Sequence, residues 1–297
     1  VWKVIIGRAS LYLLDTNIKE NPPEIRDINF HLYRSDAGVR LAQEVILGIG
    51  GMRALDAMDI YPIVCHMNEG HCSFSSIERL KQIMTRQQVD LKTAIEIGSR
   101  TTVFTTHTPV SAGHDEFPPE RVRPYLVPFA DPFEIPAEDL VSWGQRAGDG
   151  AESPFSMFVL GLRLSQYCNG VSELHGSVAR KMWAHVWPGR PEEEVPISHV
   201  TNGAHIPSWI SIENSLLFDR YLEPGWHLNA WNSELSKRID DIYDEELWRA
   251  HEMGRTRLVR SCRNLMVSQY SRRNASKSVM RDAESVLDKA VLTIAFA

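Results

Sequence analysis

The sequence has no apolar run of membrane-spanning length. A transmembrane helix needs about 20 consecutive apolar residues, and every apolar stretch in these 297 residues is broken well before that. An excess of basic charge is missing too, because 38 acidic residues outnumber 32 basic ones and leave a net charge of −6. A nucleic-acid binder would show a basic face instead. We therefore expect neither a membrane nor a nucleic acid as partner.

Small motifs for metal or phosphate binding are also missing. The four cysteines are Cys65, Cys72, Cys168 and Cys262. They show no Cys-x-x-Cys spacing, which argues against structural zinc and fits reduced thiols. No Gly-x-Gly-x-x-Gly or Walker-type loop occurs. No secretory signal is visible, and we expect a cytoplasmic protein with one large or two moderate domains.

Four apolar runs of strand length end in polar loops, and the clearest covers residues 101–106. Its β-branched and aromatic residues predict a buried strand. A loop begins after His107, at Pro109 and Gly113. A second apolar run over 61–65 leads into a loop with several polar residues. The polar segments that follow the other three runs are 66–71, 169–172 and 199–203.

These strand ends predict a binding edge. Strands and helices alternate over residues 60–205, which predicts an α/β fold with a Rossmann-like parallel sheet and right-handed crossovers. Ligands bind at the carboxyl edge of such sheets. Histidine, asparagine, glutamate and serine would meet there. Uncharged and weakly basic groups of this kind suit a polyhydroxylated ligand such as a sugar.

Helical periodicity covers much of the remaining chain. The main predicted helices cover 36–58, 73–84, 90–99, 155–167 and 208–286, and a further one ends at Trp183. Residues 1–16 are predicted to form two short strands hinged at Gly7 and Arg8. The segment 116–153 is rich in proline, glycine and acidic residues, and we interpret it as a flexible insertion. The aromatic residues expected to anchor the C-terminal helices are Trp209, Trp226, Trp231 and Trp248.

A series of sequence blocks, taken together, resembles a known enzyme family. The blocks are Leu11 to Asn17, Leu32-Tyr33 with Arg40 to Glu44, His66 to His71, Thr101 to Asp115, Asn169 to Ser172 with Leu174 to Gly176, Arg180 to Trp183, Trp187 to Pro191, and His199 to Gly203. They occur in the order found in the α-glucan phosphorylases. The chain is similar to the shorter bacterial and archaeal branch of these glycogen, starch and maltodextrin phosphorylases.

The resemblance implies a fold and a domain plan. It implies the N-terminal domain of a GT-B type glycosyltransferase fold. Residues 1–207 would form its Rossmann-like portion, and 208–289 a helical segment that leads to the interdomain crossover. Residues 290–297 would begin the first strand of a C-terminal domain. Because chains of the family are much longer, we expect an internal fragment of the enzyme.

The resemblance also implies a reaction. In the family, phosphate displaces the terminal glucose of an α-1,4-glucan or maltodextrin and releases glucose 1-phosphate. Pyridoxal 5'-phosphate is the cofactor of the full-length parent, but its lysine lies outside this chain. We therefore expect no cofactor on the fragment, which supplies a glucosyl-binding half-site and is inactive alone. Association into a homo-oligomer is also expected.

The resemblance assigns site residues one by one. His107 matches the histidine that contacts the reacting glucose, and it is the catalytic candidate. Asn202 matches an asparagine that holds the 6-hydroxyl of the same sugar. Glu69, paired with His71, and Asn169 are further candidates for substrate binding. For each of these three, a structural role in its loop or turn is an open alternative.

Three further residues are expected to have structural roles. His66 is expected in the core at a strand end. His175 and Arg180 are expected to support a helix.

The rivals to the phosphorylase function are a sugar-nucleotide-dependent glucan synthase and a non-catalytic glucan-binding module. A metal enzyme built on loop histidines is a third rival, but no His-x-x-x-His pair supports it and we predict no metal site.

Overall fold

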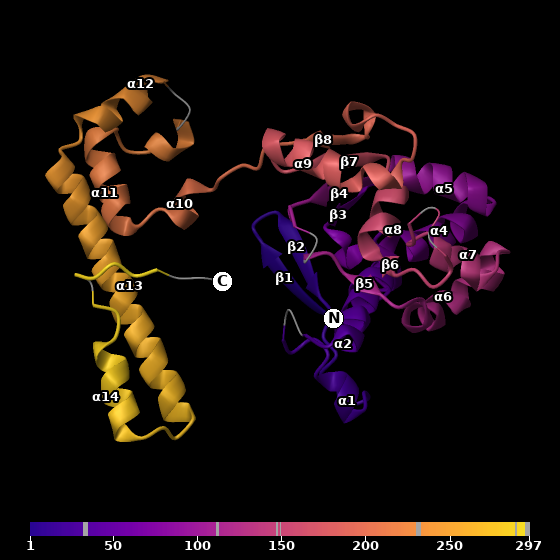
Figure 1. The fold of residues 1–297 in the computed structure, drawn as a ribbon, viewed down its shortest axis with the longest axis horizontal. Coiled ribbons are helices and arrows are strands. Elements are labelled where there is room, and N and C mark those ends of the chain that lie inside the picture. The colour runs from indigo at the N-terminus through magenta and orange to yellow at the C-terminus, as the bar shows by residue number, and fades with distance from the viewer. Residues whose placement is uncertain are drawn as a thin grey trace. The chain divides into compact units, whose positions relative to one another are not determined.

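The structure is a computed structural model that describes residues 1–31, 35–110, 113–146, 148, 150–229, 233–288 and 290–294. It divides into two compact units, Val1–Asn202 and Gly203–Ala297 (Figure 1). The block Leu32-Tyr33, the expected anchor Trp231 and residues 295–297 of the predicted last strand lie outside the described residues. No helix in the described ranges is both long enough and apolar enough to cross a bilayer.

A four-stranded parallel sheet lies at the centre of the first unit. In spatial order its strands are β3 (Cys65–Asn68), β4 (Thr102–Thr106), β7 (Tyr167–Gly170) and β8 (Ile197–His199). The prediction of an α/β fold with these four parallel strands is confirmed, and the sheet is compatible with a Rossmann-like arrangement.

The register of the sheet separates an apolar row from a polar row. The buried row is Met67, Phe104, Cys168 and Ile197. The next row is Asn68, Thr105, Asn169 and Ser198. Because successive side chains of a strand point to opposite faces, the two rows lie on different faces of the sheet. One face therefore packs into the core and the other carries hydrogen-bonding groups.

The first strand begins later than predicted. The apolar run 61–65 was expected to form it, but Ile63 is 84% exposed and Val64 is 56% exposed. Pairing starts only at Cys65, whose N–H donates to the carbonyl of Thr101. His66 therefore lies inside the strand and is exposed, so its predicted place in the core is wrong. The start of β3 is set by where β4 begins to pair with it, and the hydrophobicity of the run does not indicate that position.

Two helices cover the apolar face of the sheet. Phe158 of α8 (Met157–Arg163) and Trp183 of α9 (Glu173–Trp183) belong to the same buried cluster as Phe104. The rings of Phe158 and Trp183 stack with centroids 4.5 Å apart and planes 6° apart. This layer fixes the strands whose ends carry the predicted site.

A second core lies among the remaining helices of this unit. They are α2 (Ala37–Val45), α3 (Gly51–Ala57), α4 (Phe74–Gln87), α5 (Leu91–Arg100), α6 (Pro119–Phe133) and α7 (Ala137–Ser142). The predicted helix 36–58 is present, but a π-helical turn, η1 (Ile46–Gly50), interrupts it. There Gly48 meets Phe74 so closely that an added Cβ would lie 2.7 Å from the Phe74 Cβ. Glycine is required at that contact.

The predicted flexible insertion at 116–153 is wrong, because most of it folds into α6 and α7. The buried side chains of α6 are Val122, Leu126, Phe129 and Phe133. Its prolines, Pro124, Pro128 and Pro132, are four residues apart and exposed. Each proline removes a bond to a carbonyl four residues earlier. Because these carbonyls share the exposed side of the helix, water can satisfy them, and the apolar spacing decides the fold.

Short elements complete the first unit. They are β1 (Trp2–Ile6), β2 (Ala9–Leu13), α1 (Pro23–Arg26), η2 (Gly70–Cys72), β5 (Glu116–Phe117), β6 (Phe155–Ser156), η4 (Ala184–Val186) and η5 (Glu192–Glu194). The predicted hairpin is confirmed: β1 pairs antiparallel with β2. Gly7 has a φ of 59° at its turn, a conformation that glycine adopts without steric cost.

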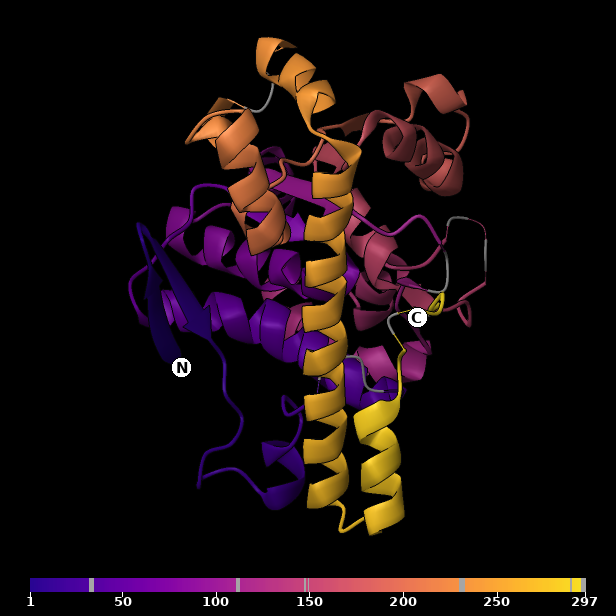
Figure 2. The ribbon, with the colours of Figure 1, turned by 90° about the vertical axis from the view of Figure 1, so that its left-hand side faces the viewer.

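The second unit is helical, as predicted. Its elements are α10 (Ile206–Trp209), α11 (Ile212–Tyr221), η6 (Trp226–Asn229), α12 (Ser233–Lys237), η7 (Arg238–Asp241), α13 (Asp244–Arg272) and α14 (Lys277–Ser285). Figure 2 shows α14 returning alongside the long α13. Trp226 is buried, but Trp209 and Trp248 are 84% and 58% exposed, so their predicted anchoring role is wrong. Residues 292–294 form no strand.

Candidate functional site

The carboxyl ends of the four strands lie at one edge of the sheet, and His107 and Asn202 both lie there. His107 directly follows β4. Beyond β8 the chain continues beside the end of β7, because the N–H of Asn202 donates to the carbonyl of Val171 at 3.1 Å. β7 lies between β4 and β8. Because neighbouring strands are about 4.8 Å apart, the backbones at these two residues are separated by roughly 10 Å across the sheet. Both side chains are exposed.

Glu69 binds the backbone at the start of the His107 loop. Its Oε1 accepts hydrogen bonds from the N–H groups of His107 and Thr108, the second at 2.8 Å. The residue is 7% exposed, and its Oε2 is buried without a partner. The carboxylate therefore acts within the protein, and its predicted pairing with His71 is wrong. A contact of Glu69 with substrate stays a prediction.

His114 holds the same loop from its other side. Its Nε2 lies 3.3 Å from the carbonyl oxygen of Thr108. The ring packs against Phe158 and Trp183, with centroid distances of 4.3 and 4.8 Å. Burial lowers the pKa of His114, which favours a neutral ring. A neutral ring with its proton on Nε2 can donate to Thr108.

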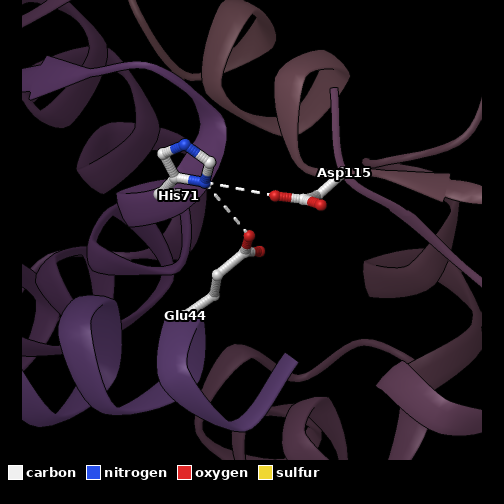
Figure 3. Close-up of side chains that lie close together, drawn as sticks. All are labelled: Glu44, His71 and Asp115. Carbon is white, nitrogen blue, oxygen red and sulfur yellow. Dashed lines mark hydrogen bonds and ion pairs between the residues drawn. The ribbon is translucent and has the colours of Figure 1, made fainter. Parts of the chain in front are cut away.

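A cluster of titratable side chains gathers around His71 (Figure 3). Its Nδ1 lies 3.3 Å from Oε1 of Glu44 and 3.2 Å from Oδ2 of Asp115. Glu44 comes from α2, and Asp115 precedes β5. The same oxygen of Asp115 also pairs with Arg40, another residue of α2. The cluster thus ties the far end of the His107 loop to the helix.

The pKa values in this cluster move in opposite directions. Burial raises the pKa of Glu44 to about 8. Hydrogen bonds to Asp115 and Glu44 raise the pKa of His71 to about 10. Burial would raise the pKa of Asp115, but hydrogen bonds with His71, Glu44 and Arg40 outweigh it and lower that pKa to about 2. Near neutral pH, His71 and Asp115 therefore form an ion pair beside a largely protonated Glu44.

The same three residues have the donor set of a metal site. In the part of the chain that the structure describes, their ligand atoms form a group within 4.8 Å of one another. However, the raised pKa of His71 favours a protonated ring, whose Nδ1–H would face both carboxyl groups, and Arg40 pairs with the Asp115 oxygen. A divalent ion would have to displace that proton and approach the guanidinium. The geometry fits a proton-bridged ion pair better than a metal centre.

Asn169 and the other structural candidates are engaged within the fold. The side-chain oxygen of Asn169 accepts from the Thr105 hydroxyl at 2.9 Å. That hydroxyl lies 2.7 Å from Nε2 of His66, so a polar chain crosses three strands. His175 accepts from the N–H of Val171, and Arg180 donates to the carbonyl of Ile197, which confirms their structural roles. A substrate contact of Asn169 stays a prediction.

Sequence reasoning missed Glu44, Arg40 and Asp115 as a group. One signal was available for Glu44, because it falls on the apolar side of its helix, three residues after the buried Leu41. A carboxylate at such a position needs a partner. The partner could not be read from the sequence, since His71 and Asp115 lie 27 and more residues away.

Two members of the cluster, Glu44 and His71, line a cavity of about 720 Å³. Its polar lining comes from Asn29, His31, Arg40, Gln43, Glu44, His71 and Ser75. Most of the remaining lining is apolar and comes from β2 and the helices α2 and α3 with the π-helical turn between them. This cavity is distinct from the strand edge that carries His107 and Asn202.

Comparison with curated proteins finds similarity along most of the chain. A maltodextrin phosphorylase of Thermococcus litoralis is 41% identical over 250 residues, which are 84% of this chain and 29% of that protein. A glycogen phosphorylase of Mycobacterium tuberculosis is 35% identical over an alignment of 317 residues that covers 100% of this chain and 35% of that protein. A glycogen phosphorylase of Aquifex aeolicus is 32% identical over 297 residues, 100% of this chain and 42% of that protein.

The chain therefore spans well under half the length of these relatives, between 29% and 42%. No family model matches the sequence.

Proposed function

The chain belongs to the family of glycogen and maltodextrin phosphorylases, and we propose that it forms one half of the glucosyl-binding site of an α-glucan phosphorylase. In the whole enzyme, phosphate would displace the terminal glucose of an α-1,4-glucan or maltodextrin and give glucose 1-phosphate. The observation that carries the proposal is the meeting of His107 and Asn202 at one edge of a parallel sheet in a chain with such relatives.

The proposed work of this edge is to hold and orient the sugar. His107 and Asn202 offer neutral donors and acceptors, which suit hydroxyl groups of the glucosyl unit. As the glycosidic bond breaks, positive charge develops on the sugar, and groups already held in place stabilise that state without reorganisation. His107 would act on the reacting glucose, and Asn202 would hold its 6-hydroxyl. His71 and Asn169 would add further contacts to the substrate.

Pyridoxal 5'-phosphate in the parent would be held by residues outside this chain. The cofactor needs a lysine in an enclosed site, but the described lysines are exposed or half-buried. None of them lines the 720 Å³ cavity or the 840 Å³ groove between α13 and α14. The residues present do not fit the cofactor, and we assign them no step that passes through it.

The same proposal covers the wider setting. The sheet unit would be part of the N-terminal domain of a GT-B type glycosyltransferase fold, in a cytoplasmic enzyme. The parallel sheet and its crossover helices support this assignment. Association of copies is a further part of the proposal, supported by the exposed apolar side chains of the helical unit.

The decisive experiment is phosphorolysis by the full-length parent. His107→Ala and Asn202→Ala should each lower kcat by ~10²-fold or more, as loss of a group preorganised for the transition state does, with little change in melting temperature. His251→Ala, on the exposed helix α13, is the control and should be normal. Normal turnover in His107→Ala would refute its role. Glucose transfer from a sugar nucleotide without phosphate would favour the synthase instead.

A second measurement uses the 297-residue chain itself. It should release no glucose 1-phosphate from maltodextrin and phosphate. It should also take up no stoichiometric pyridoxal 5'-phosphate, measured by absorbance after borohydride reduction. Turnover by this chain would overturn the half-site proposal.

A further inference from the structure

We propose that Glu69 and His114 are positioning residues that fix Thr108, the residue after His107, by binding its backbone N–H and its backbone carbonyl. Glu69 accepts from the N–H of Thr108, and His114 faces the carbonyl of Thr108. This inference rests on the proposed function of His107. It assigns neither residue a contact with substrate.

The backbone of Glu69 supports this role. Its φ of 64° and ψ of −179° lie in a region that is essentially open to glycine alone. A glycine would adopt this conformation without strain. The chain nevertheless has a residue with a long acidic side chain here, and the side chain is buried. The side chain must therefore offset the strain of this backbone conformation.

The side chain of Glu69 continues the sheet where the backbone of β3 leaves it. The N–H of Glu69 makes the last ladder bond, to the carbonyl of Thr105 at 2.9 Å. β4 ends at Thr106, and two further N–H groups follow it along the chain. Oε1 of Glu69 accepts from both of them, those of His107 and Thr108. One carboxylate oxygen thus binds two consecutive backbone N–H groups at the predicted catalytic residue.

His114 completes the arrangement from the opposite side. Packing against Phe158 and Trp183 fixes its ring plane, and those two rings belong to the core under the sheet. Its bond to Thr108 therefore attaches the loop to the packed core of the unit. Next to it, Asp115 ties the end of the loop to Arg40 and His71. The loop that begins at His107 is held at both ends.

Such fixing matters for a group that must meet a transition state. A displacement of about 1 Å at a reacting centre can cost roughly 10²-fold in rate. His107 has an exposed ring, so its placement depends on its backbone. Glu69 and His114 set that backbone.

Hydrogen exchange of the full-length enzyme tests the contact without reference to activity. A proteolytic peptide over residues 105–109 reports on His107 and Thr108, because the first two residues of such a peptide do not retain the label and Pro109 has no amide hydrogen. Glu69→Gly removes the carboxylate but suits the backbone conformation, so the protein should fold. We expect exchange in this peptide to rise about tenfold or more as the two acceptor bonds are lost.

Two variants serve as comparisons in the exchange measurement. Glu69→Gln keeps an acceptor oxygen and should restore most of the protection. Glu96→Gln, at an exposed carboxylate on α5, should match the unmodified enzyme. Unchanged exchange in Glu69→Gly, or a Gln variant as unprotected as the Gly variant, would overturn the contact.

Kinetics then test whether the contact positions a catalytic group. Glu69→Gly should lower kcat for phosphorolysis by roughly 10²-fold, with KM for the glucan within about threefold of normal. His114→Phe keeps the ring packing but loses the bond to Thr108, and it should lower kcat by a smaller factor. Normal kcat in Glu69→Gly together with raised exchange would overturn the positioning role.

The two proposals fail in different ways. If His107→Ala lowers kcat but Glu69→Gly does not, the positioning inference is wrong and the proposed function stands. If His107→Ala has normal kcat, the proposed function of His107 fails and the positioning role falls with it. The exchange result still decides the contact in that case.

Discussion

The two units of this protein bury their apolar side chains to very different extents. The sheet unit contains two large clusters, and Phe74, Phe104 and Phe158 are at most 1% exposed. Within its described residues, the helical unit contains two clusters of three buried residues each. Its longest helix, α13, buries Ala250 alone among its 29 residues. Several of its large apolar side chains are exposed, namely Leu247, Trp248, Met253, Leu258 and Leu265.

This difference shows where each unit obtains its stability. Apolar burial is the dominant favourable contribution to folding, and the sheet unit has enough of it to hold strained features such as Glu69. In the helical unit, contacts between helices include the Arg257–Glu213 pair at 2.8 Å. Ion pairs that are partly exposed to solvent, as Arg257 is in this pair, stabilise weakly. A rigid site is therefore expected in the first unit.

The largest expected effect comes from the core beneath the strand edge. Phe104→Ala should lower the free energy of unfolding of the sheet unit by about 3–5 kcal/mol, because it removes a fully buried ring and leaves a cavity. Urea unfolding followed by hydrogen exchange can resolve the two units. The helical unit should keep its exchange rates. A loss below about 1 kcal/mol would break the comparison, since it would mean that this core is not closely packed.

The second effect is a pH dependence that belongs to the sheet unit. Glu44 has a raised pKa, so its contribution to stability is present below its ordinary value of 4.5 and is lost as pH rises through about 8. The contribution of His71 is present below 6.5 and is lost as pH rises through about 10. That of Asp115 is present above 3.8 and is lost as pH falls through about 2. Stability should thus fall on both sides of mildly acidic pH.

Glu44→Gln isolates the first of these steps. It should flatten the decline of the unfolding free energy between pH 4.5 and about 8, where one proton contributes a slope of at most about 1.4 kcal/mol per pH unit. Urea unfolding across this range measures the slope. Glu96→Gln, at an exposed carboxylate, is the control. A Gln variant with the same slope as the unmodified chain would show that Glu44 does not titrate in that window.

The sequence predicted the sheet well because strands carry a local signal. The runs before His107 and before Asn169 are followed by polar loops, and both form strands of the parallel sheet. Over 116–153 the number of prolines suggests a loop, but Pro124, Pro128 and Pro132 are spaced by four and share the exposed side of a helix. The apolar positions Val122, Leu126 and Phe129 carried the helical signal instead.

The site was less predictable, because its contacts join distant segments. His107 and Asn202 were expected at one edge, and the order of the strands places them there. The bonds from Glu69 to the His107 loop span 38 and 39 residues and depend on a backbone turn that no pattern indicates. The contacts of His71 with Glu44 depend on which helix packs beside it. Such contacts follow from tertiary packing and not from spacing.

A third, smaller effect should be equal in the two units. Asp90 caps α5 by accepting from the N–H of Thr93 at 2.8 Å, and Ser211 caps α11 by accepting from Asn214 at 3.2 Å. Asp90→Ala and Ser211→Ala should each cost about 1 kcal/mol, because capping satisfies a local donor wherever the helix lies. Thermal unfolding of both variants tests this. A cost of zero for Ser211→Ala would mean that the start of α11 is frayed.

The last prediction concerns an exposed apolar side chain of the helical unit. Leu265 lies on α13 and is 61% exposed, so Leu265→Ala should change the free energy of unfolding by less than about 0.5 kcal/mol. The measurement should be repeated over a wide range of protein concentration. A cost that grows with concentration would show that α13 is covered by a second copy in solution, since association stabilises the folded form by mass action. A cost above about 1 kcal/mol at every concentration would show that this side chain is packed within the chain, and the contrast between the units would fail.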